Sequence, residues 1–200
     1  ARSCAGIYAL YPDIIRVVDF SDYQGSISSE TFRKLREEQG VRYIMPQIYG
    51  GRSDGTVGPN SHLKEQVNNA LSVGLEILGG YVFPSSKWKE ALDYWKKTFP
   101  NLQLPILALD VEPGSADATV KPGYIRSVRS RGVIPIIYSS KGDWKKVMEG
   151  KPNEYWFAEN GVCLWGASWD YDKGWWGGWH DEKRIDVATG NLKPWSVPTP

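Results

Sequence analysis

The sequence predicts an α/β protein, an irregular TIM-like β/α barrel, and three observations lead to this prediction. Apolar, β-rich runs alternate with amphipathic helical stretches through most of the 200-residue chain, the pattern of parallel strands joined by helical crossovers. After Glu149 the alternation stops, so the last part of the chain should supply strands joined by loops that close the sheet. No Gly-x-Gly-x-x-Gly follows the first strand, which disfavours the alternative, an open doubly wound sheet that binds a dinucleotide.

The expected strands are apolar runs rich in β-branched and aromatic residues, bounded by turn residues. They are Ile15–Phe20, Arg42–Tyr49, Ile77–Phe83, Leu104–Glu112, Val133–Tyr138 and Val162–Trp169, with a last short strand over Arg184–Val187.

The expected helices lie between these strands and show the spacing of apolar residues typical of helices that pack on a sheet. They are Ser29–Glu38, Ser61–Val73, Lys87–Thr98, Pro122–Arg131 and Lys141–Met148. Ser28 suits the capping position of the first helix, and Pro122 suits the first turn of the fourth. The stretch 170–181 is rich in Gly and Trp and should form no long helix, while the proline-rich tail 194–200 should lie loose on the surface.

Length and charge limit the class of protein. We expect one catalytic domain over residues 1–200, with its core over about 14–188, because the chain is too short for two ordinary domains. Lys and Arg number 24 against 23 Asp and Glu, a net charge of +1 without blocks of like charge. This balance disfavours nucleic acid or an anionic membrane as partner. No run approaches the roughly 20 apolar residues of a membrane helix. We expect a monomer, since no heptad pattern indicates an oligomer.

The aromatic residues and the cysteines each leave two interpretations open. The chain has 10 Trp and 11 Tyr against 5 Phe, and aromatics with a polar handle suit a wall that binds a sugar ring, although core packing explains any single tryptophan equally well. Cys4 and Cys163 have no neighbouring Cys or His with zinc-site spacing. They form either a disulfide, in a secreted protein, or two separate buried thiols.

Two acids end the fourth expected strand, within the run Leu107–Gly114. Side chains two apart on a strand share a face, so Asp110 and Glu112 should point into the barrel with Ala108, and the aliphatic residues between them should point toward the helices. The carboxyl end of the strands is where β/α barrels build their active sites. The two carboxyl groups should lie about 5 to 7 Å apart, close enough to act as an acid and a neighbouring carboxylate in glycosidic bond cleavage.

Further acids follow other strands. Asp19 ends the first strand and Asp186 lies in the last, which favours one shared site, whereas Asp22 suits a surface or capping position. The spacing would also allow a divalent metal, but His62 and His180 show no ligand pattern with these acids. We therefore expect no metal and no organic cofactor.

Several motifs, taken in order, resemble glycoside hydrolase family 25, the Chalaropsis-type lysozymes. The motifs are Val17–Gly25, Gly80–Pro84, Pro105–Gly114, Pro135–Ser140 and Leu164–Trp169. The second strand, Tyr43–Tyr49, looks most like the invertebrate and protist branch. The resemblance covers roughly residues 14–188, and the Asp-x-Glu strand with Asp19 is its most specific part.

The resemblance implies an irregular barrel of about five β/α units plus closing strands. It also implies a secreted muramidase that cleaves the β-1,4 bond between N-acetylmuramic acid and N-acetylglucosamine in bacterial peptidoglycan, with an antibacterial or wall-degrading role outside the cell, in a lytic vacuole or in a gut lumen. Glu112 would be the general acid. Asp110 would orient the substrate N-acetyl group or act as nucleophile, and Asp19 and Asp186 would flank them.

The resemblance also implies which residues line the sugar groove. We expect substrate contacts from Gln47, Tyr49, Tyr81, Tyr138 and Trp165. Gln47–Gly51 stands where many members of the family have a basic residue and a Glu-Gly pair, so a charged contact is missing here. Two alternatives stay open: a carbohydrate-binding protein on the same barrel without useful turnover, and a hydrolase of a chitin-like polymer.

Overall fold

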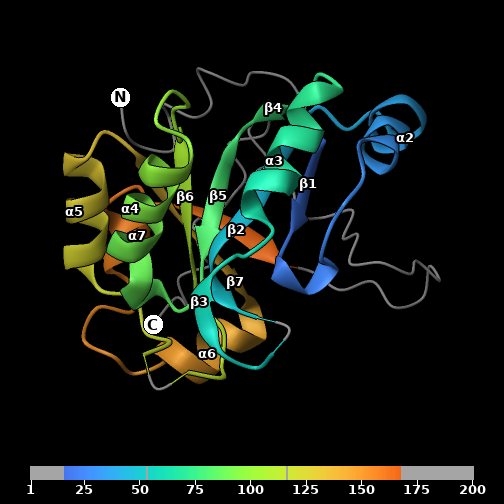
Figure 1. Cartoon of the computed structure of the whole chain (residues 1–200). Helices are drawn as coiled ribbons and strands as arrows, with labels where there is room; N and C mark the ends of the chain where they lie inside the picture. Colours follow the sequence, from blue (N-terminus) through green and yellow to red (C-terminus); the bar gives the residue numbers. More distant parts are fainter. Residues whose placement is uncertain (1–15, 53, 116, 168–200) are drawn as a thin grey trace.

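The computed structural model describes residues 16–52, 54–115 and 117–167 and shows a curled, mainly parallel sheet with helices on its outer face (Figure 1). The neighbouring strands run in the order β1-β2-β5-β6-β7-β8. Their bounds are β1 Val17–Phe20, β2 Tyr43–Gly51, β5 Gly79–Val82, β6 Ile106–Asp110, β7 Ile134–Ser140 and β8 Cys163–Ala167. Two short strands, β3 (Val57–Pro59) and β4 (Glu76–Ile77), both pair with β2. This is the predicted α/β, TIM-like barrel arrangement, seen over the described residues as a partial barrel.

The helices connect successive parallel strands. Their bounds are α2 Ser29–Gln39, α3 Leu63–Ser72, α4 Trp88–Thr98, α5 Pro122–Ser130, α6 Lys141–Met148 and α7 Trp156–Glu159, with short 3-10 helices η1 Asp22–Gln24 and η2 Ser85–Lys87. The Ser28 side chain caps α2 by accepting from the Thr31 backbone, as predicted. In Figure 1 α4 and α5 lie toward the left of the view and α2 and α3 toward the right. No helix among the described residues is long and apolar enough to cross a membrane.

The side chains of the strands divide into two apolar clusters, one on each face of the sheet. The outer cluster holds Leu107, Leu109 and Val111 of the β6 segment, all fully buried against the helices. The inner cluster holds Ile106 and Ala108 of the same strand. The predicted alternation along this run is therefore confirmed. The inner cluster also contains Met45, Leu78, Ile134, Ile136, Tyr138, Cys163 and Trp165.

Two glycines let β5 pack closely between its neighbours. A side chain at Gly79 would place its Cβ 2.4 Å from the Ile106 carbonyl oxygen, and one at Gly80 would come within 2.6 Å of Ile48. Neither position has room for a side chain, so Tyr81 is the first residue of β5 that projects a large group toward the inner face.

The structure differs from the sequence prediction in several elements, and part of the prediction lies outside the described residues. Strand β3 and helix α7 were not predicted, because three and four residues are too few to show a period. The expected strand Ile77–Phe83 is divided into β4 and β5. Pairing between β2 and β5 shifts register between Gln47 and Tyr49. The expected strand Arg184–Val187 and the tail 194–200 lie outside the described residues.

Candidate active site

Three of the four predicted acids lie at the carboxyl ends of β1 and β6. Asp19 is the third residue of β1 and is half-buried. Asp110 is the last residue of β6 and is 5% exposed. Glu112 follows two residues later and is half-buried. The fourth acid, Asp186, lies outside the described residues.

Three aromatic side chains from β5, β7 and β8 form a wall beside these acids. Tyr138 pairs in register with Asp110 on one side and Trp165 on the other. The Trp165 ring meets the Tyr138 ring edge to face, with centroids 4.9 Å apart, and the Tyr81 ring at 6.5 Å. These contacts bring together three of the five predicted substrate-binding residues. We call Tyr81, Tyr138 and Trp165 the aromatic wall.

The negative charges of the acids act on both tyrosines of the aromatic wall. Burial raises the pKa of Tyr81 well above 10, and the negative charges of Asp19 and Asp110 raise it further, while a hydrogen bond with the Ser21 side chain lowers it. Burial likewise raises the pKa of Tyr138, with added contributions from Glu112, Asp110 and Asp19. Both hydroxyls therefore stay protonated and can donate hydrogen bonds at any ordinary pH.

Gln47 and Tyr49 were predicted to contact substrate, and the structure separates the two: Gln47 pairs in register with Tyr81 of the aromatic wall, whereas Tyr49 packs on the outer face of the sheet. The Gln47 side chain is buried and accepts a 3.4 Å hydrogen bond from the Asp22 backbone. The Tyr49 ring packs against the outer cluster. A register shift between these two residues changes the alternation along β2, which explains why Tyr49 does not follow Met45 and Gln47 inward. Their contact with substrate stays a prediction.

A buried polar network supports the loop after Asp19. Asp22 is 3% exposed, and its Oδ1 accepts hydrogen bonds from the Ser61 backbone at 2.7 Å and the Ser61 hydroxyl at 2.6 Å. The expectation that Asp22 lies on the surface is therefore wrong, although it does cap the turn before α3. A carboxylate is tolerated there because hydrogen bonds compensate for its burial.

Two residues of this network gave no signal in the sequence. Asn60 is fully buried and donates to the Gln47 carbonyl at 3.0 Å and to the Gln66 side chain at 2.9 Å. Gln66, also fully buried, donates to the Ser21 carbonyl at 3.0 Å and the Gly25 carbonyl at 2.6 Å. These two carbonyls lie more than 40 residues earlier in the chain than Gln66, so α3 holds η1 in place through contacts that only the folded chain creates.

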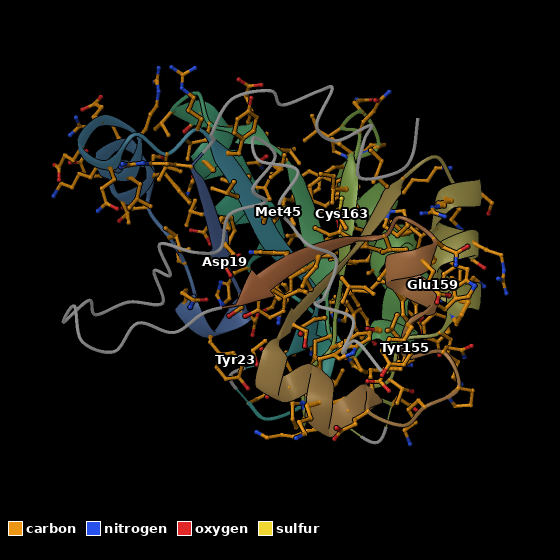
Figure 2. The ribbon with its side chains drawn as sticks, turned by 180° about the vertical axis from the view of Figure 1, so that it is seen from behind. Asp19, Tyr23, Met45, Tyr155, Glu159 and Cys163 are labelled. Atoms are coloured by element: carbon orange, nitrogen blue, oxygen red, sulfur yellow. The ribbon has the colours of Figure 1, made fainter. Side chains whose placement is uncertain are left out.

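An exposed aromatic residue beside the acids was also not singled out from the sequence. Tyr23, on η1, is 61% exposed, and Figure 2 shows it beyond Asp19 toward the carboxyl ends of the strands. Its ring lies over Gly51, where a Cβ would come within 3.4 Å of the Tyr23 hydroxyl. Val57 pairs with Gly51 and is 51% exposed. The only signal for Tyr23 in the sequence was its position four residues after Asp19.

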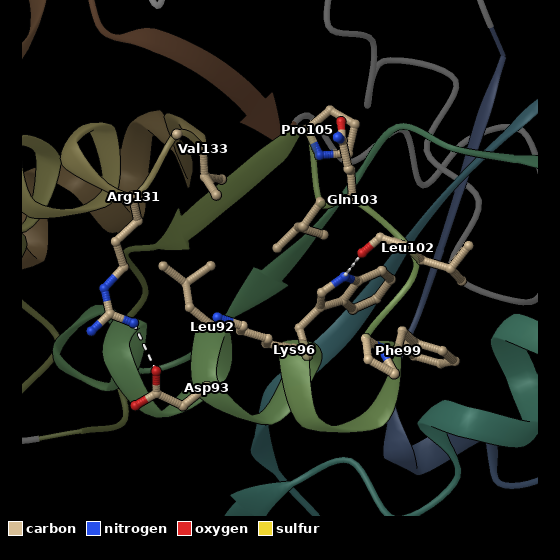
Figure 3. Close-up of a pocket in the computed structure, with 13 residues that line it drawn as sticks. Leu92, Asp93, Lys96, Phe99, Leu102, Gln103, Pro105, Arg131 and Val133 are labelled. Atoms are coloured by element: carbon tan, nitrogen blue, oxygen red, sulfur yellow. Dashed lines mark hydrogen bonds and ion pairs between the residues drawn. The ribbon is translucent and has the colours of Figure 1, made fainter.

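A cavity of about 630 Å³ lies at the opposite end of the sheet (Figure 3). It is lined by the second half of α4 and by the segments that lead into β6 and β7, including Leu92, Phe99, Pro105 and Val133. Its charged groups are Lys96 and the pair of Arg131 with Asp93, which are 2.7 Å apart. Of the predicted acids, the three that the structure describes, Asp19, Asp110 and Glu112, do not line it, so its place in the fold separates it from them.

Two further predictions concern a metal and a disulfide. Over the ranges 16–52, 54–115 and 117–167, no group of three or more His, Cys, Asp or Glu side chains could hold a metal ion. Cys163 begins β8, is 3% exposed and takes part in a disulfide. Cys4 lies outside the described residues, so its pairing with Cys163 stays a prediction.

Comparison with known proteins supports the fold class that the sheet defines. No protein-family profile matches the chain. No curated protein matches it either. Among solved structures, a similar one is the modular Cpl-1 endolysin, a mutant complexed with a peptidoglycan analogue, a tetrasaccharide-pentapeptide. The TM-score is 0.53 at 19% sequence identity, over 82% of this chain and 46% of the endolysin chain. This chain thus matches less than half the length of that modular protein and shares with it the β/α barrel fold.

Proposed function

We propose that this chain is a peptidoglycan hydrolase, and more specifically a lysozyme of glycoside hydrolase family 25. The observation that carries the proposal is the convergence of Asp19, Asp110 and Glu112 on one space beside the aromatic wall, at the carboxyl end of the strands. The peptidoglycan analogue bound by the structurally similar endolysin supports the choice of substrate class.

The proposed reaction is hydrolysis of the β-1,4 bond between N-acetylmuramic acid and N-acetylglucosamine. Glu112 acts as the general acid that protonates the leaving oxygen. Asp110 either orients the N-acetyl group that attacks the anomeric carbon or attacks it directly. Asp19 and Asp186 shape the charge of the site. No metal or organic cofactor enters this scheme.

The aromatic wall and Tyr23 hold the glycan. Tyr81 and Tyr138 keep their hydroxyl protons and can donate to sugar oxygens, and Trp165 between them fixes the orientation of both rings. Tyr23 offers an exposed face on a short helix that the capping box of Ser21 and Gln24 fixes. Aromatic faces of this kind stack on the apolar faces of sugar rings.

We also propose that the protein acts outside the cytoplasm, in the extracellular space or in a lytic compartment. The disulfide at Cys163 supports this proposal, because disulfides persist in oxidising environments.

The test is clearing of bacterial cell-wall suspensions by the wild type, by Glu112→Gln and by Glu76→Gln. Glu76 is exposed on β4 at the amino end of the sheet and serves as a matched control. We expect clearing by the wild type and by Glu76→Gln, loss of clearing in Glu112→Gln, and new reducing ends of N-acetylmuramic acid. Equal clearing by all three chains would refute the role of Glu112. Binding to walls without clearing by the wild type would favour the carbohydrate-binding alternative, and N-acetylglucosamine at the new reducing ends would exclude a muramidase.

A further inference from the structure

The segment that carries the two central acids leaves the sheet before it reaches the second one. Strand β6 ends at Asp110, and Val111 and Glu112 follow outside any strand. Backbone carbonyls buried beyond the end of a ladder need other partners. The direction in which Glu112 points therefore depends on what holds the backbone between residues 110 and 112.

Two buried serines, one from each neighbouring element, bind this backbone. Ser85, the first residue of η2 after β5, donates its hydroxyl to the Asp110 carbonyl at 2.8 Å. Ser139, near the end of β7, donates its hydroxyl to the Val111 carbonyl at 2.7 Å. Ser85 is 0% exposed and Ser139 is 1% exposed, so water does not compete for either carbonyl. The Ser85 hydroxyl thus adds one hydrogen bond on the β5 side of this segment, and the Ser139 hydroxyl adds one on the β7 side.

Val111 and Pro113 fix the rest of the segment. The Val111 backbone N–H donates to the Tyr138 carbonyl at 2.9 Å, and its side chain is fully buried in the outer cluster. Pro113 restricts the preceding Glu112 to extended backbone conformations. The alternation of the strand thus continues past its last ladder pair, and Glu112 stays on the face of Asp110.

We propose that Ser85 and Ser139, here called the serine clamp, are positioning residues that set the spacing between the Asp110 and Glu112 carboxyl groups. This inference rests on the proposed function. A displacement near 1 Å at reacting groups can cost on the order of a hundredfold in rate. Removing one of two hydroxyls should therefore lower kcat about tenfold or more. Ser139 should matter more than Ser85, because its partner carbonyl directly precedes Glu112.

The first experiment separates positioning from a purely structural role. Ser139→Ala and Ser85→Ala are assayed for release of reducing ends from cell walls, with Ser130→Ala as control. Ser130 also donates its hydroxyl to a backbone carbonyl at 2.8 Å, but at the amino end of the sheet and exposed to solvent. We expect a fall in kcat for both clamp variants with KM within about twofold of wild type, and no change for Ser130→Ala. Ser139→Cys keeps a weak hydrogen-bond donor of similar size, so its kcat should lie between those of Ser139→Ala and wild type. If Ser139→Ala does not fold, Ser139→Cys is assayed in its place.

A double-mutant comparison tests whether the clamp acts through the acid. In a Glu112→Gln background, Ser139→Ala should leave the residual rate unchanged within about twofold, because the general acid whose position relative to Asp110 the clamp sets has been removed. An equal fold loss in both backgrounds would overturn the proposal, as would a wild-type rate for both clamp variants.

A readout without turnover keeps the clamp separate from the proposed function. Carboxyl ¹³C NMR titration of the folded chains should show the midpoints of Asp110 and Glu112 moving by about half a pH unit or more in Ser139→Ala, because coupling between two carboxyls depends on their separation. Unchanged midpoints would refute the clamp even in an active enzyme. If the wild type releases no reducing ends, the proposed function fails, and the titration alone decides on the clamp.

Discussion

Removing the Asp22 carboxylate should destabilise the protein far more than removing a carboxylate with the same hydrogen bonds at the surface. Asp22 Oδ1 accepts from the backbone and hydroxyl of Ser61 and is 3% exposed. Asp54 Oδ1 accepts from the backbone and hydroxyl of Thr56 at 2.9 and 2.6 Å, but its side chain is exposed. The two residues therefore form a matched pair that differs in burial.

The size of the effect follows from the groups left without partners. Asp22→Ala leaves the Ser61 N–H and hydroxyl without their acceptor next to a buried network, and each hydrogen bond to a charged group contributes about 1.5 to 3 kcal/mol. Allowing for some relaxation, we expect a loss of about 2 to 4 kcal/mol in the free energy of unfolding, or roughly 5 to 15 °C in Tm for a chain of this size. Asp22→Asn keeps an acceptor oxygen and should lose about half as much.

Urea unfolding and thermal melts of wild type, Asp22→Ala, Asp22→Asn and Asp54→Ala provide the assay. Asp54→Ala should stay close to wild type, because water replaces both of its hydrogen bonds. If Asp22→Ala loses no more stability than Asp54→Ala, burial does not determine the strength of these bonds, and the argument for a supporting network under η1 fails.

Three further predictions concern pH, substrate binding and the cavity. The pKa of Tyr138 in the folded chain is raised above its value in the unfolded chain. The contribution of Tyr138 to stability is therefore complete below about pH 10 and is lost as the pH rises further, by roughly 1.4 kcal/mol per pH unit. Between pH 8 and 11, the urea midpoint of Tyr138→Phe should fall less steeply than that of wild type, and parallel curves would contradict this prediction. Tyr23→Ala should raise KM for cell walls about three- to tenfold with Tm unchanged. Tyr155, another exposed tyrosine, lies on the opposite side of the view in Figure 2, and Tyr155→Ala should leave KM unchanged. If Tyr23→Ala has the same KM as wild type, Tyr23 does not contact the glycan. Arg131→Gln breaks the surface ion pair with Asp93 and should leave both wall clearing and Tm near wild type, since surface ion pairs contribute little to stability. A loss of clearing would indicate that the cavity in Figure 3 takes part in the activity.

The strand-end positions of Asp19, Asp110 and Glu112 could be predicted from the sequence because their placement follows from local rules. A period of two along Ile106–Val111 determined which side chains face the helices, and the turn after Glu112 indicated the end of the strand. The barrel arrangement followed from the alternation of strands and helices in the same way, since each crossover between parallel strands is local in the chain.

The parts that the sequence did not predict depend on contacts between distant segments. Asn60 and Gln66 look like ordinary polar residues until folding brings α3 against η1. Asp22 reads as a surface acid because its partner Ser61 lies 39 residues away. Tyr49 follows the expected period of two, but the register shift in β2 turns its ring toward the outer cluster, and no local pattern indicates such a shift.

The position of β1 in the sheet has a consequence for how the integrity of the site is measured. Within the described part of the chain, β1 is four residues long and pairs with β2 alone, whereas β6, which carries Asp110, lies between β5 and β7. Local opening of such an end strand costs less free energy than global unfolding. Asp19, on β1, and the pair Asp110 and Glu112, on the β6 segment, are therefore held by parts of the sheet that differ in local stability. A melting temperature reports on the strands around β6, and a variant can keep that temperature while Asp19 no longer faces its partners.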